Sequence, residues 1–259
     1  MTGGIDMEYN FDAKRAIKEL VAWIRDWFDT NGGEKAIVGI SGGKDSSVAA
    51  ALCVEALGKD RVIGVTMPNG EQSDYHDSML LINHLGIEHI DINIKDAVDS
   101  IENAIGNCSE QTRINLPPRI RMSALYAVSQ SNRGRVVNTC NASENYVGYA
   151  TKWGDNVGDF SPLGGLTTGE IVDMGIELGL PDHLVYKIPS DGLCGKTDED
   201  NLGVTYRDIN RFIRCYETDQ LLDKAVEKIK KMYDNSRFKE DILNLPTYIP
   251  SLNVLYSSK

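Results

Sequence analysis

The residues best suited to chemistry are gathered in one short stretch, Gly39-Ile40-Ser41-Gly42-Gly43-Lys44-Asp45-Ser46. Adjacent glycines let a backbone follow the outline of a phosphate closely, and serine hydroxyls add hydrogen-bond donors. Asp45 supplies a carboxylate that could hold Mg²⁺ against phosphate oxygens. The stretch therefore predicts a loop that binds the phosphates of a nucleotide.

Two predicted elements position this loop. The run Ala36-Ile37-Val38 with Ile40 is typical of a buried parallel strand, and residues 48–57 have the composition of a helix. A loop between them lies at a helix N-terminus, where unpaired N–H groups and the helix dipole favour an anion. A tight turn capped by serines would account for the glycines and serines, but it would not require Asp45.

Two other phosphate-binding patterns do not fit the loop. The Walker A pattern needs glycine five residues before its Gly-Lys pair and Ser or Thr after it, where this chain has Val38 and Asp45. The dinucleotide fingerprint needs a glycine two residues after Gly39, where Ser41 stands. The remaining pattern, Ser-Gly-Gly-x-Asp-Ser, resembles the signature loop of the N-type ATP pyrophosphatases, which split ATP between its α and β phosphates.

Length and composition indicate a single domain over residues 1–259. The chain is 41% hydrophobic and 25% charged, with no repeat or low-complexity run. Its formal net charge of −11 disfavours nucleic acid as a partner, and its five cysteines without a Cys-x-x-Cys spacing imply neither a disulfide framework nor a zinc site. No window reaches the length of a membrane span and the first residues lack the features of a signal peptide, so we expect a cytoplasmic protein without a membrane partner.

Apolar strand patterns alternate with helical patterns along the chain. This alternation predicts an α/β fold with a doubly wound, mostly parallel sheet, helices on both faces and a ligand crevice at the carboxyl ends of the strands. A C-terminal helical part, at about 204–240, is expected to pack on the sheet domain. The predicted strands cover about 36–40, 61–67, 87–94 and 135–139, and the predicted helices cover about 13–28, 48–57, 74–85, 96–105, 119–131 and 218–235.

Further motifs occur in the same order as in one known family. Asn138-Thr139-Cys140-Asn141-Ala142-Ser143-Glu144 follows a predicted strand, Lys152–Asp159 is a glycine-rich loop, and residues 198–206 read DEDNLGVTY. With the first loop, these motifs make the chain resemble ammonia-dependent NAD synthetase over roughly residues 10–240. The resemblance implies an adenine nucleotide α-hydrolase-like fold. It also implies a ligase that adenylates the carboxylate of deamido-NAD with ATP and lets ammonia displace AMP, which yields NAD and pyrophosphate in the last step of NAD biosynthesis.

The family pattern also implies roles for residues of this chain. It places Mg²⁺, the cofactor, on Asp45 and Glu144, and it makes Asp45, Asp155 and Lys152 catalytic, with Asp155 orienting ammonia or taking up its proton. The implied partners are deamido-NAD, ATP, ammonia and a second copy of the chain in a homodimer. The implied ATP contacts are Gly39, Ile40, Ser41, Gly42, Gly43, Lys44, Asp45, Ser46, Thr139, Thr168 and Ser190, and the implied deamido-NAD contacts are Arg119, Lys152, Asp159 and Lys239.

Three positions depart from the family pattern. Thr168 stands where the family often has a lysine near the ATP phosphates, so one expected cation is missing. Ser190 replaces a threonine but keeps the hydroxyl, and Phe238-Lys239 replaces a His-Lys pair that contacts deamido-NAD. Recognition of deamido-NAD at this end of the chain is therefore expected to differ from the family pattern.

Other functions remain open for a chain with this first loop. A tRNA-modifying or GMP-synthetase-like pyrophosphatase would share it, as would a sensor that binds ATP without turnover. The acidic net charge disfavours a tRNA-modifying enzyme, and the motifs at 138–144 and 152–159 disfavour a GMP-synthetase-like one. Two metal-binding carboxylates disfavour a sensor that only retains ATP. Glu144 at a helix start and Thr139 in a strand also have ordinary structural explanations. Roughly 35 residues precede the first strand, too few for an amidase domain, so we expect free ammonia rather than glutamine as the nitrogen donor.

Overall fold

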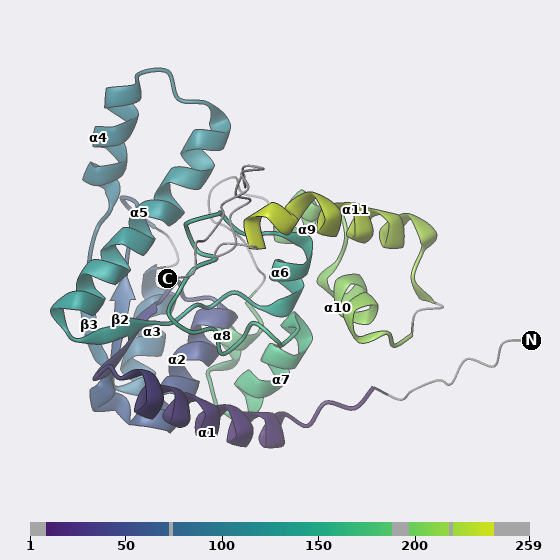
Figure 1. Cartoon of the computed structure of the whole chain (residues 1–259), viewed down its shortest axis with the longest axis horizontal. Coiled ribbons are helices and arrows are strands. Elements are labelled where there is room, and N and C mark those ends of the chain that lie inside the picture. Colours follow the sequence, from purple (N-terminus) through teal and green to yellow (C-terminus); the bar gives the residue numbers. More distant parts are fainter. Residues whose placement is uncertain (1–8, 73–74, 188–196, 218–219, 241–259) are drawn as a thin grey trace, which may run out of the picture.

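One parallel sheet organises the chain. The structure, a computed structural model, describes residues 9–72, 75–187, 197–217 and 220–240. Within this part of the chain the strand order is β3-β2-β1-β4, and all neighbours are parallel (Figure 1). The carboxyl ends of the strands therefore meet at one edge of the sheet. The strands are β1 (Lys35–Gly39), β2 (Val62–Thr66), β3 (Glu88–Asp91) and β4 (Gly134–Val136).

Helices cover both faces of the sheet because successive residues of each strand point to opposite sides. Ala36 and Val38 of β1 belong to one apolar cluster, whereas Ile37 between them belongs to another. The predicted doubly wound α/β fold is thus confirmed. The helices packed in the first cluster are α1 (Ala13–Asn31), α2 (Lys44–Leu57), α3 (Tyr75–Leu85), α7 (Thr168–Glu177) and α8 (Asp182–Val185), with the short η1 (Lys59–Arg61) between α2 and β2.

The second face is covered by α5 (Glu110–Ser131), which packs Met122, Leu125 and Val128 on the sheet, and α4 (Lys95–Ile105) lies beside α5. The predicted helix over 119–131 was wrong about its start. Ser109 caps the helix by accepting the Thr112 N–H at 3.1 Å, so the helix is already established before Pro117 and Pro118. The fixed φ of proline suits a helix, and the chain tolerates the loss of two N–H donors there.

A third apolar cluster lies beside the sheet domain, on the side away from β3 (Figure 1). Val147, Leu202, Ile209 and Ile229 form its buried centre. The last helix runs five residues further than the predicted end at 235, and its predicted start at 218 lies outside the described residues. The helices of this cluster are α6 (Ala142–Val147), α9 (Asp198–Leu202), α10 (Tyr206–Arg214) and α11 (Asp223–Glu240).

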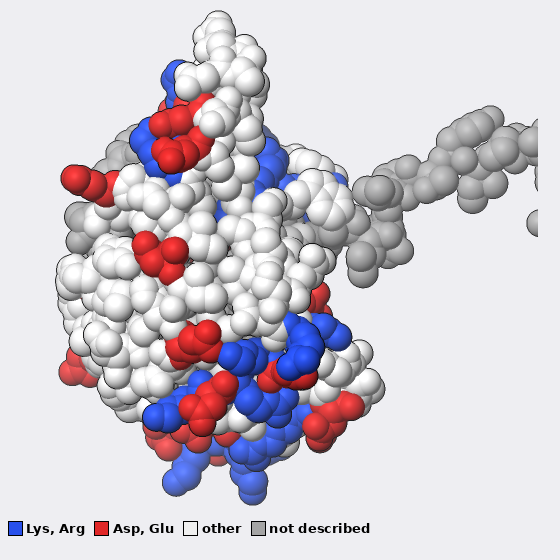
Figure 2. Space-filling view, turned by 90° about the vertical axis from the view of Figure 1, so that its left-hand side faces the viewer, with Lys and Arg blue, Asp and Glu red and all other residues white. Residues whose placement is uncertain are grey.

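The exposed edge of the sheet is β3, where Glu88 and Asp91 are open to solvent. Lys35 pairs with Glu88 across the sheet at 2.6 Å. Figure 2 shows this side of the molecule, where acidic side chains accompany the basic ones and much of the middle is uncharged. No helix among the described residues is both long enough and apolar enough to cross a bilayer.

Candidate active site

The predicted phosphate loop joins β1 to α2 and is held in shape by its own serines. Ser46 Oγ lies 3.1 Å from Ser41 Oγ and donates to the Gly43 carbonyl at 3.1 Å. The Gly43 N–H donates to Ser41 Oγ at 3.2 Å, and Ser47 Oγ donates to the Gly43 carbonyl at 2.7 Å. The helix begins at Lys44 without a capping side chain from the described residues, so its first N–H groups face the loop and favour an anion there.

Gly42 shows why this loop needs glycine. Its φ of +74° is in the left-handed region, and a Cβ would lie 2.7 Å from Asp77 Cβ and 2.9 Å from the Ser78 backbone nitrogen. The start of α3 therefore packs directly against the loop. Ser78 Oγ also donates to the Ile40 carbonyl at 3.2 Å, which joins α3 to the end of β1.

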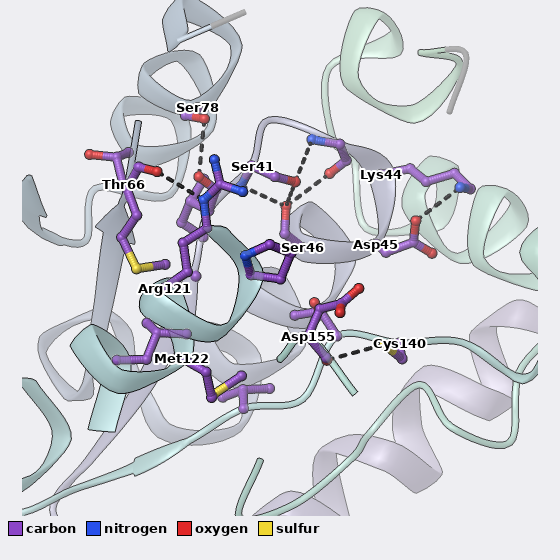
Figure 3. Close-up of a pocket in the computed structure, with 18 of the residues that line it drawn as sticks. Ser41, Lys44, Asp45, Ser46, Thr66, Ser78, Arg121, Met122, Cys140 and Asp155 are labelled. Carbon is purple, nitrogen blue, oxygen red and sulfur yellow. Dashed lines mark hydrogen bonds and ion pairs between the residues drawn. The ribbon is translucent and has the colours of Figure 1, made fainter. Parts of the chain in front are cut away.

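A cavity of about 380 Å³ opens beside the loop. It lies at the carboxyl ends of β1, β2 and β4, where an α/β sheet is expected to bind ligands. Figure 3 shows Ser41 and Ser46 of the loop with the Arg121 side chain from α5 extending toward them, whereas Met122, Asp155 and Cys140 lie lower in the view. The residues predicted to contact ATP that line this cavity are Gly39, Ile40, Ser41, Gly43, Lys44, Asp45, Ser46 and Thr139.

The two carboxylates predicted to hold Mg²⁺ lie together in this cavity, joined by Asn141. The Asn141 amide donates to Asp45 Oδ1 at 3.0 Å, and its backbone N–H donates to Glu144 Oε2 at 3.1 Å. Burial and the negative charge of Asp45 raise the pKa of Glu144 well above its ordinary value, although Lys44 opposes this. Because a dication bound between two crowded carboxylates relieves their repulsion, the donor set fits Mg²⁺.

Lys44 is the buried cation of the cavity. Its side chain is 5% exposed, its Nζ lies 2.9 Å from Asp45 Oδ2, and the ammonium faces the Tyr206 ring at 5.8 Å from the centroid. Burial lowers the pKa of Lys44, but the carboxylates of Asp45, Glu144 and Asp198 raise it more, so the net shift is upward. Lys44 therefore carries a full positive charge at neutral pH, at the helix start where phosphates would lie.

Asp198 is a cavity residue to which the sequence motifs assigned no role. It accepts hydrogen bonds from the hydroxyls of Tyr149, at 3.2 Å, and Tyr206, at 3.4 Å. The burial of Tyr206 and its acidic neighbours keep its hydroxyl protonated by raising its pKa, so it acts as a donor. The signal for Asp198 was its place at the head of the stretch DEDNLGVTY, but the sequence did not indicate that this stretch reaches the cavity.

Two further cations line the cavity and were also missed. Arg121 on α5 donates from Nε to the Met67 carbonyl at 3.0 Å, and Lys187 after α8 lies 2.7 Å from Asp77 Oδ2. Neither belongs to a recognisable motif, because each reaches the cavity only through packing between segments that are distant in the chain. They place positive charge in the cavity of a chain that has Thr168 where the family often has lysine.

Thr168 itself lies in the first turn of α7, outside the cavity lining. Its side chain is buried, its N–H donates to Ser143 Oγ at 3.1 Å, and its hydroxyl has no hydrogen-bond partner among the described residues. Its predicted contact with ATP stays a prediction. Ser190, the other predicted hydroxyl contact, lies outside the described residues.

The loop Lys152–Asp159 reaches the cavity through Asp155. The Thr151 N–H donates to Asp155 Oδ1 at 2.8 Å, and the carboxyl opens into the cavity. Surrounding protein atoms keep bulk water away and raise the pKa of Asp155, against the effect of the Thr151 N–H. A carboxylate with a raised pKa is a stronger base, which suits the predicted role in taking up a proton from ammonia.

The residues predicted to contact deamido-NAD form a second group next to the cavity. Arg119 Nε donates to the Lys152 carbonyl at 3.1 Å, and Lys152 Nζ donates to the Phe238 carbonyl at 2.6 Å. Lys239 Nζ donates to the carbonyls of Gly148 and Ala150 at 3.1 and 3.2 Å. The structure thus brings Arg119, Lys152 and Lys239 together at the end of α11, although none of them is among the lining residues of the cavity.

Asp159, the fourth residue of this set, lies on the other side of the loop. Its Oδ2 accepts the Val136 N–H at 2.7 Å, and the carboxylate raises the pKa of Tyr126, whose burial is the larger cause. These contacts tie the loop to the end of β4. The predicted contact of Asp159 with deamido-NAD remains a prediction.

The sheet, the loop and the cavity define an α/β protein of the adenine nucleotide α-hydrolase-like fold, the fold of solved NAD synthetases that it resembles in structure. The family model described as NAD synthase matches residues 16–242. Because the match covers most of its length, the chain belongs to the NAD synthase family.

Named relatives agree with this assignment. The chain is 36% identical to the NH(3)-dependent NAD(+) synthetase of Thermococcus sibiricus, covering 94% of this chain and 93% of the relative. It is 39% identical to the Methanosarcina acetivorans enzyme of the same name, over 83% and 87% of the two chains.

Two solved structures are similar as well. The NMN synthetase of Francisella tularensis has a TM-score of 0.85 and 34% identity, covering 92% of this chain and 100% of that one. The NH3-dependent NAD synthetase of Campylobacter jejuni has a TM-score of 0.78 and 25% identity, covering 93% of this chain and 100% of that one.

Proposed function

We propose that this protein is a ligase that converts deamido-NAD, ATP and ammonia to NAD, AMP and pyrophosphate. The family and the named relatives support the reaction. The observation that best supports the roles of individual residues is the pair Asp45 and Glu144, which Asn141 joins beside the serine loop. A site that only retained ATP would not need two carboxylates crowded next to its phosphates.

The first chemical step joins two anions. A nicotinate carboxylate oxygen attacks the α-phosphorus of ATP, the bond from the α-phosphorus to the bridging oxygen breaks, and pyrophosphate leaves with that electron pair. The N–H groups at the start of α2, with Lys44, Arg121 and Lys187, supply the positive potential that draws both anions into the cavity. Bound at Asp45 and Glu144, Mg²⁺ would supply further charge neutralisation for the phosphates.

In the second step ammonia attacks the carbonyl carbon of the adenylated carboxylate, and AMP leaves with the carbon–oxygen bond pair. The new amide must lose one proton. Asp155 opens into the same cavity, and its raised pKa makes it the acceptor we assign. Because the nucleophile is neutral NH₃, the rate at fixed total ammonium should rise with pH as ammonium deprotonates.

The reaction is tested by incubating the protein with deamido-NAD, ATP, Mg²⁺ and ammonium. Equal amounts of NAD, AMP and pyrophosphate are expected. ADP with phosphate, or AMP without NAD, would contradict the proposal. Glutamine free of ammonium should give almost no NAD in the same assay, and a comparable rate would show that the donor is not free ammonia.

A second candidate substrate is the shorter acid, nicotinate mononucleotide, which the same chemistry would convert to NMN. It is favoured by the similarity to the F. tularensis NMN synthetase over the whole of that chain, and by Phe238 at a position where the family has a histidine toward deamido-NAD. Comparing kcat/KM for the two acids under the same conditions decides between them. A preference for the mononucleotide of roughly tenfold or more would replace deamido-NAD as the main substrate.

We also propose that the protein works as a homodimer in the cytoplasm. The exposed rings of Trp153 and Phe238 flank Lys152, with its Nζ 5.6 and 5.5 Å from their centroids, and they give the deamido-NAD side an apolar surface. Sedimentation velocity at micromolar concentration should show a dimer. A stable monomer with full activity would contradict this part of the proposal.

A further inference from the structure

A cluster of ionisable side chains lies behind the phosphate loop, where the start of α3 meets α8. The Nε2 atoms of His76 and His183 each lie 2.8 Å from the same oxygen, Oδ1 of Asp77. The three atoms all lie within 4.8 Å of one another. The second oxygen of Asp77 lies 2.7 Å from Lys187 Nζ. One carboxylate is therefore shared by two imidazoles from separate helices and one ammonium.

Burial is distributed unequally over this cluster. The side chain of Asp77 is 3% exposed, whereas those of His76 and His183 are 72% and 61% exposed. Lys187 already provides a charge partner for the buried carboxylate, so a need for charge neutralisation does not explain two imidazoles at Oδ1.

We propose that His76, Asp77 and His183 form a binding site for a transition-metal dication such as Zn²⁺. Two imidazole nitrogens and one carboxylate oxygen are a donor set that zinc and its neighbours in the transition series accept, whereas Mg²⁺ prefers oxygen ligands alone. The cluster would thus select a different ion from the pair Asp45 and Glu144. The exposed side between the two imidazoles leaves room for water as a further ligand.

The distances suit a modest rearrangement. Zinc lies about 2.0–2.2 Å from nitrogen and oxygen ligands, so ligand atoms around it are roughly 3.3 Å apart. The imidazoles would move outward by about half an ångström from their present 2.8 Å contacts. Each ring would carry its proton on Nδ1, with water mediating the transfer from Nε2, so that the Nε2 lone pair is free for the metal. Both rings are largely exposed, so this movement meets little resistance from packing.

Metal binding here would connect three parts of the molecule. It would cross-link α3 to α8, because His76 and Asp77 belong to one helix and His183 to the other. The metal would also neutralise part of the Asp77 charge that now pairs with Lys187, a residue that lines the cavity. Asp77 in turn packs against Gly42 of the phosphate loop.

The test is direct metal binding by the ATP-free protein. Zn²⁺ is titrated by calorimetry, and Co²⁺ is added separately so that its visible absorption reports the ligand environment. We expect one equivalent of Zn²⁺ to bind and to raise the Tm of the wild-type protein. His76→Ala and His183→Ala should each weaken binding roughly tenfold or more and abolish most of the rise in Tm.

The matched control is His84→Ala, which removes an exposed histidine from the same helix α3 and should leave binding unchanged. Because the two ligand histidines are exposed, their variants should fold, and circular dichroism without metal checks this. The proposal is overturned if the wild-type protein binds no equivalent of Zn²⁺ at about 100 μM. It is equally overturned if the His183→Ala variant binds like the wild type, or if Cys215→Ser alone removes the binding.

Discussion

The two sides of the candidate active site are built in different ways. On the side proposed to bind ATP, the polar groups bond mostly to one another, as Ser41 and Ser46 do, and they leave the start of α2 facing the cavity. On the side proposed to bind deamido-NAD, the ammonium groups of Lys152 and Lys239 donate to backbone carbonyls. The first side is therefore arranged in advance, whereas substrate on the second side must compete with bonds that the protein already makes.

The sharpest test of the ATP side is Asp45→Asn, which keeps the size of the side chain but removes the charge that would hold Mg²⁺. We expect kcat to fall roughly 1,000-fold while the Tm stays close to that of the wild type. Steady-state NAD formation and calorimetric titration with Mg²⁺ and ATP measure the effect, with Asp60→Asn in the exposed η1 as control. Wild-type activity in Asp45→Asn would refute the metal assignment.

Asp155 lies where the two sides meet. With Asn in its place, kcat should fall roughly 100-fold because the proton of the attacking ammonia loses its acceptor. The raised pKa of Asp155 predicts that wild-type kcat falls as the pH drops through that raised value, even when the concentration of neutral NH₃ is held constant. Asp155→Asn should lose this pH dependence, and Asp99→Asn on α4 should keep it. If kcat of Asp155→Asn and kcat of Asp99→Asn depend on pH in the same way, the pH dependence belongs to a group other than Asp155.

An ion pair joins α7, which packs in the first apolar cluster, to α10, which packs in the third. Arg214 donates to both carboxylate oxygens of Glu170, at 2.7 and 2.6 Å, and Glu170 also accepts from Tyr9. Arg214→Met should cost about 2–3 kcal/mol of unfolding free energy at pH 7, because Glu170 would remain buried without its partner.

The same pair predicts how stability depends on pH. Burial raises the pKa of Glu170, but Arg214 and other donors lower it more, so the folded value lies below the unfolded one. The ionised Glu170 carboxylate therefore contributes to the free energy of unfolding at any pH above its pKa in the unfolded chain. This contribution is lost as the pH falls through the lower pKa of Glu170 in the folded protein. The free energies of unfolding of the wild type and Arg214→Met, measured with urea, should therefore become equal at acidic pH. Arg207→Met, exposed on α10, should follow the wild type throughout, and a constant gap for Arg214→Met would contradict the linkage.

The smallest predicted effect belongs to the deamido-NAD side. Lys239→Ala should raise the KM for deamido-NAD roughly 3–10-fold and leave the KM for ATP nearly unchanged. Lys230→Ala, exposed on the same helix, is the matched control. Equal effects on both substrates would mean that Lys239 acts by positioning the loop through the Gly148 and Ala150 carbonyls rather than by contacting the substrate.

The sequence predicted most where function depends on a local pattern. The loop from Gly39 to Ser46 could be interpreted because its glycines, serines and carboxylate are neighbours in the chain, and the alternation of strands and helices indicated the fold. Arg121, Lys187 and Asp198 could not be found in this way, because they reach the cavity only through packing between distant segments. The start of α5 was missed because the cap at Ser109 outweighs two prolines that usually end a helix.

Glu144 has a structural role in α6 in addition to its proposed role in binding a cation. It completes the capping box of α6, so one of its oxygens is already bonded to Asn141 when the helix forms. The folding of this short helix and the affinity of the cation site are therefore one linked equilibrium. Any change that frays α6, even on the side away from the cavity, should weaken the hold on the cation, and saturating cation should in turn protect the amide hydrogens of α6 from exchange with solvent.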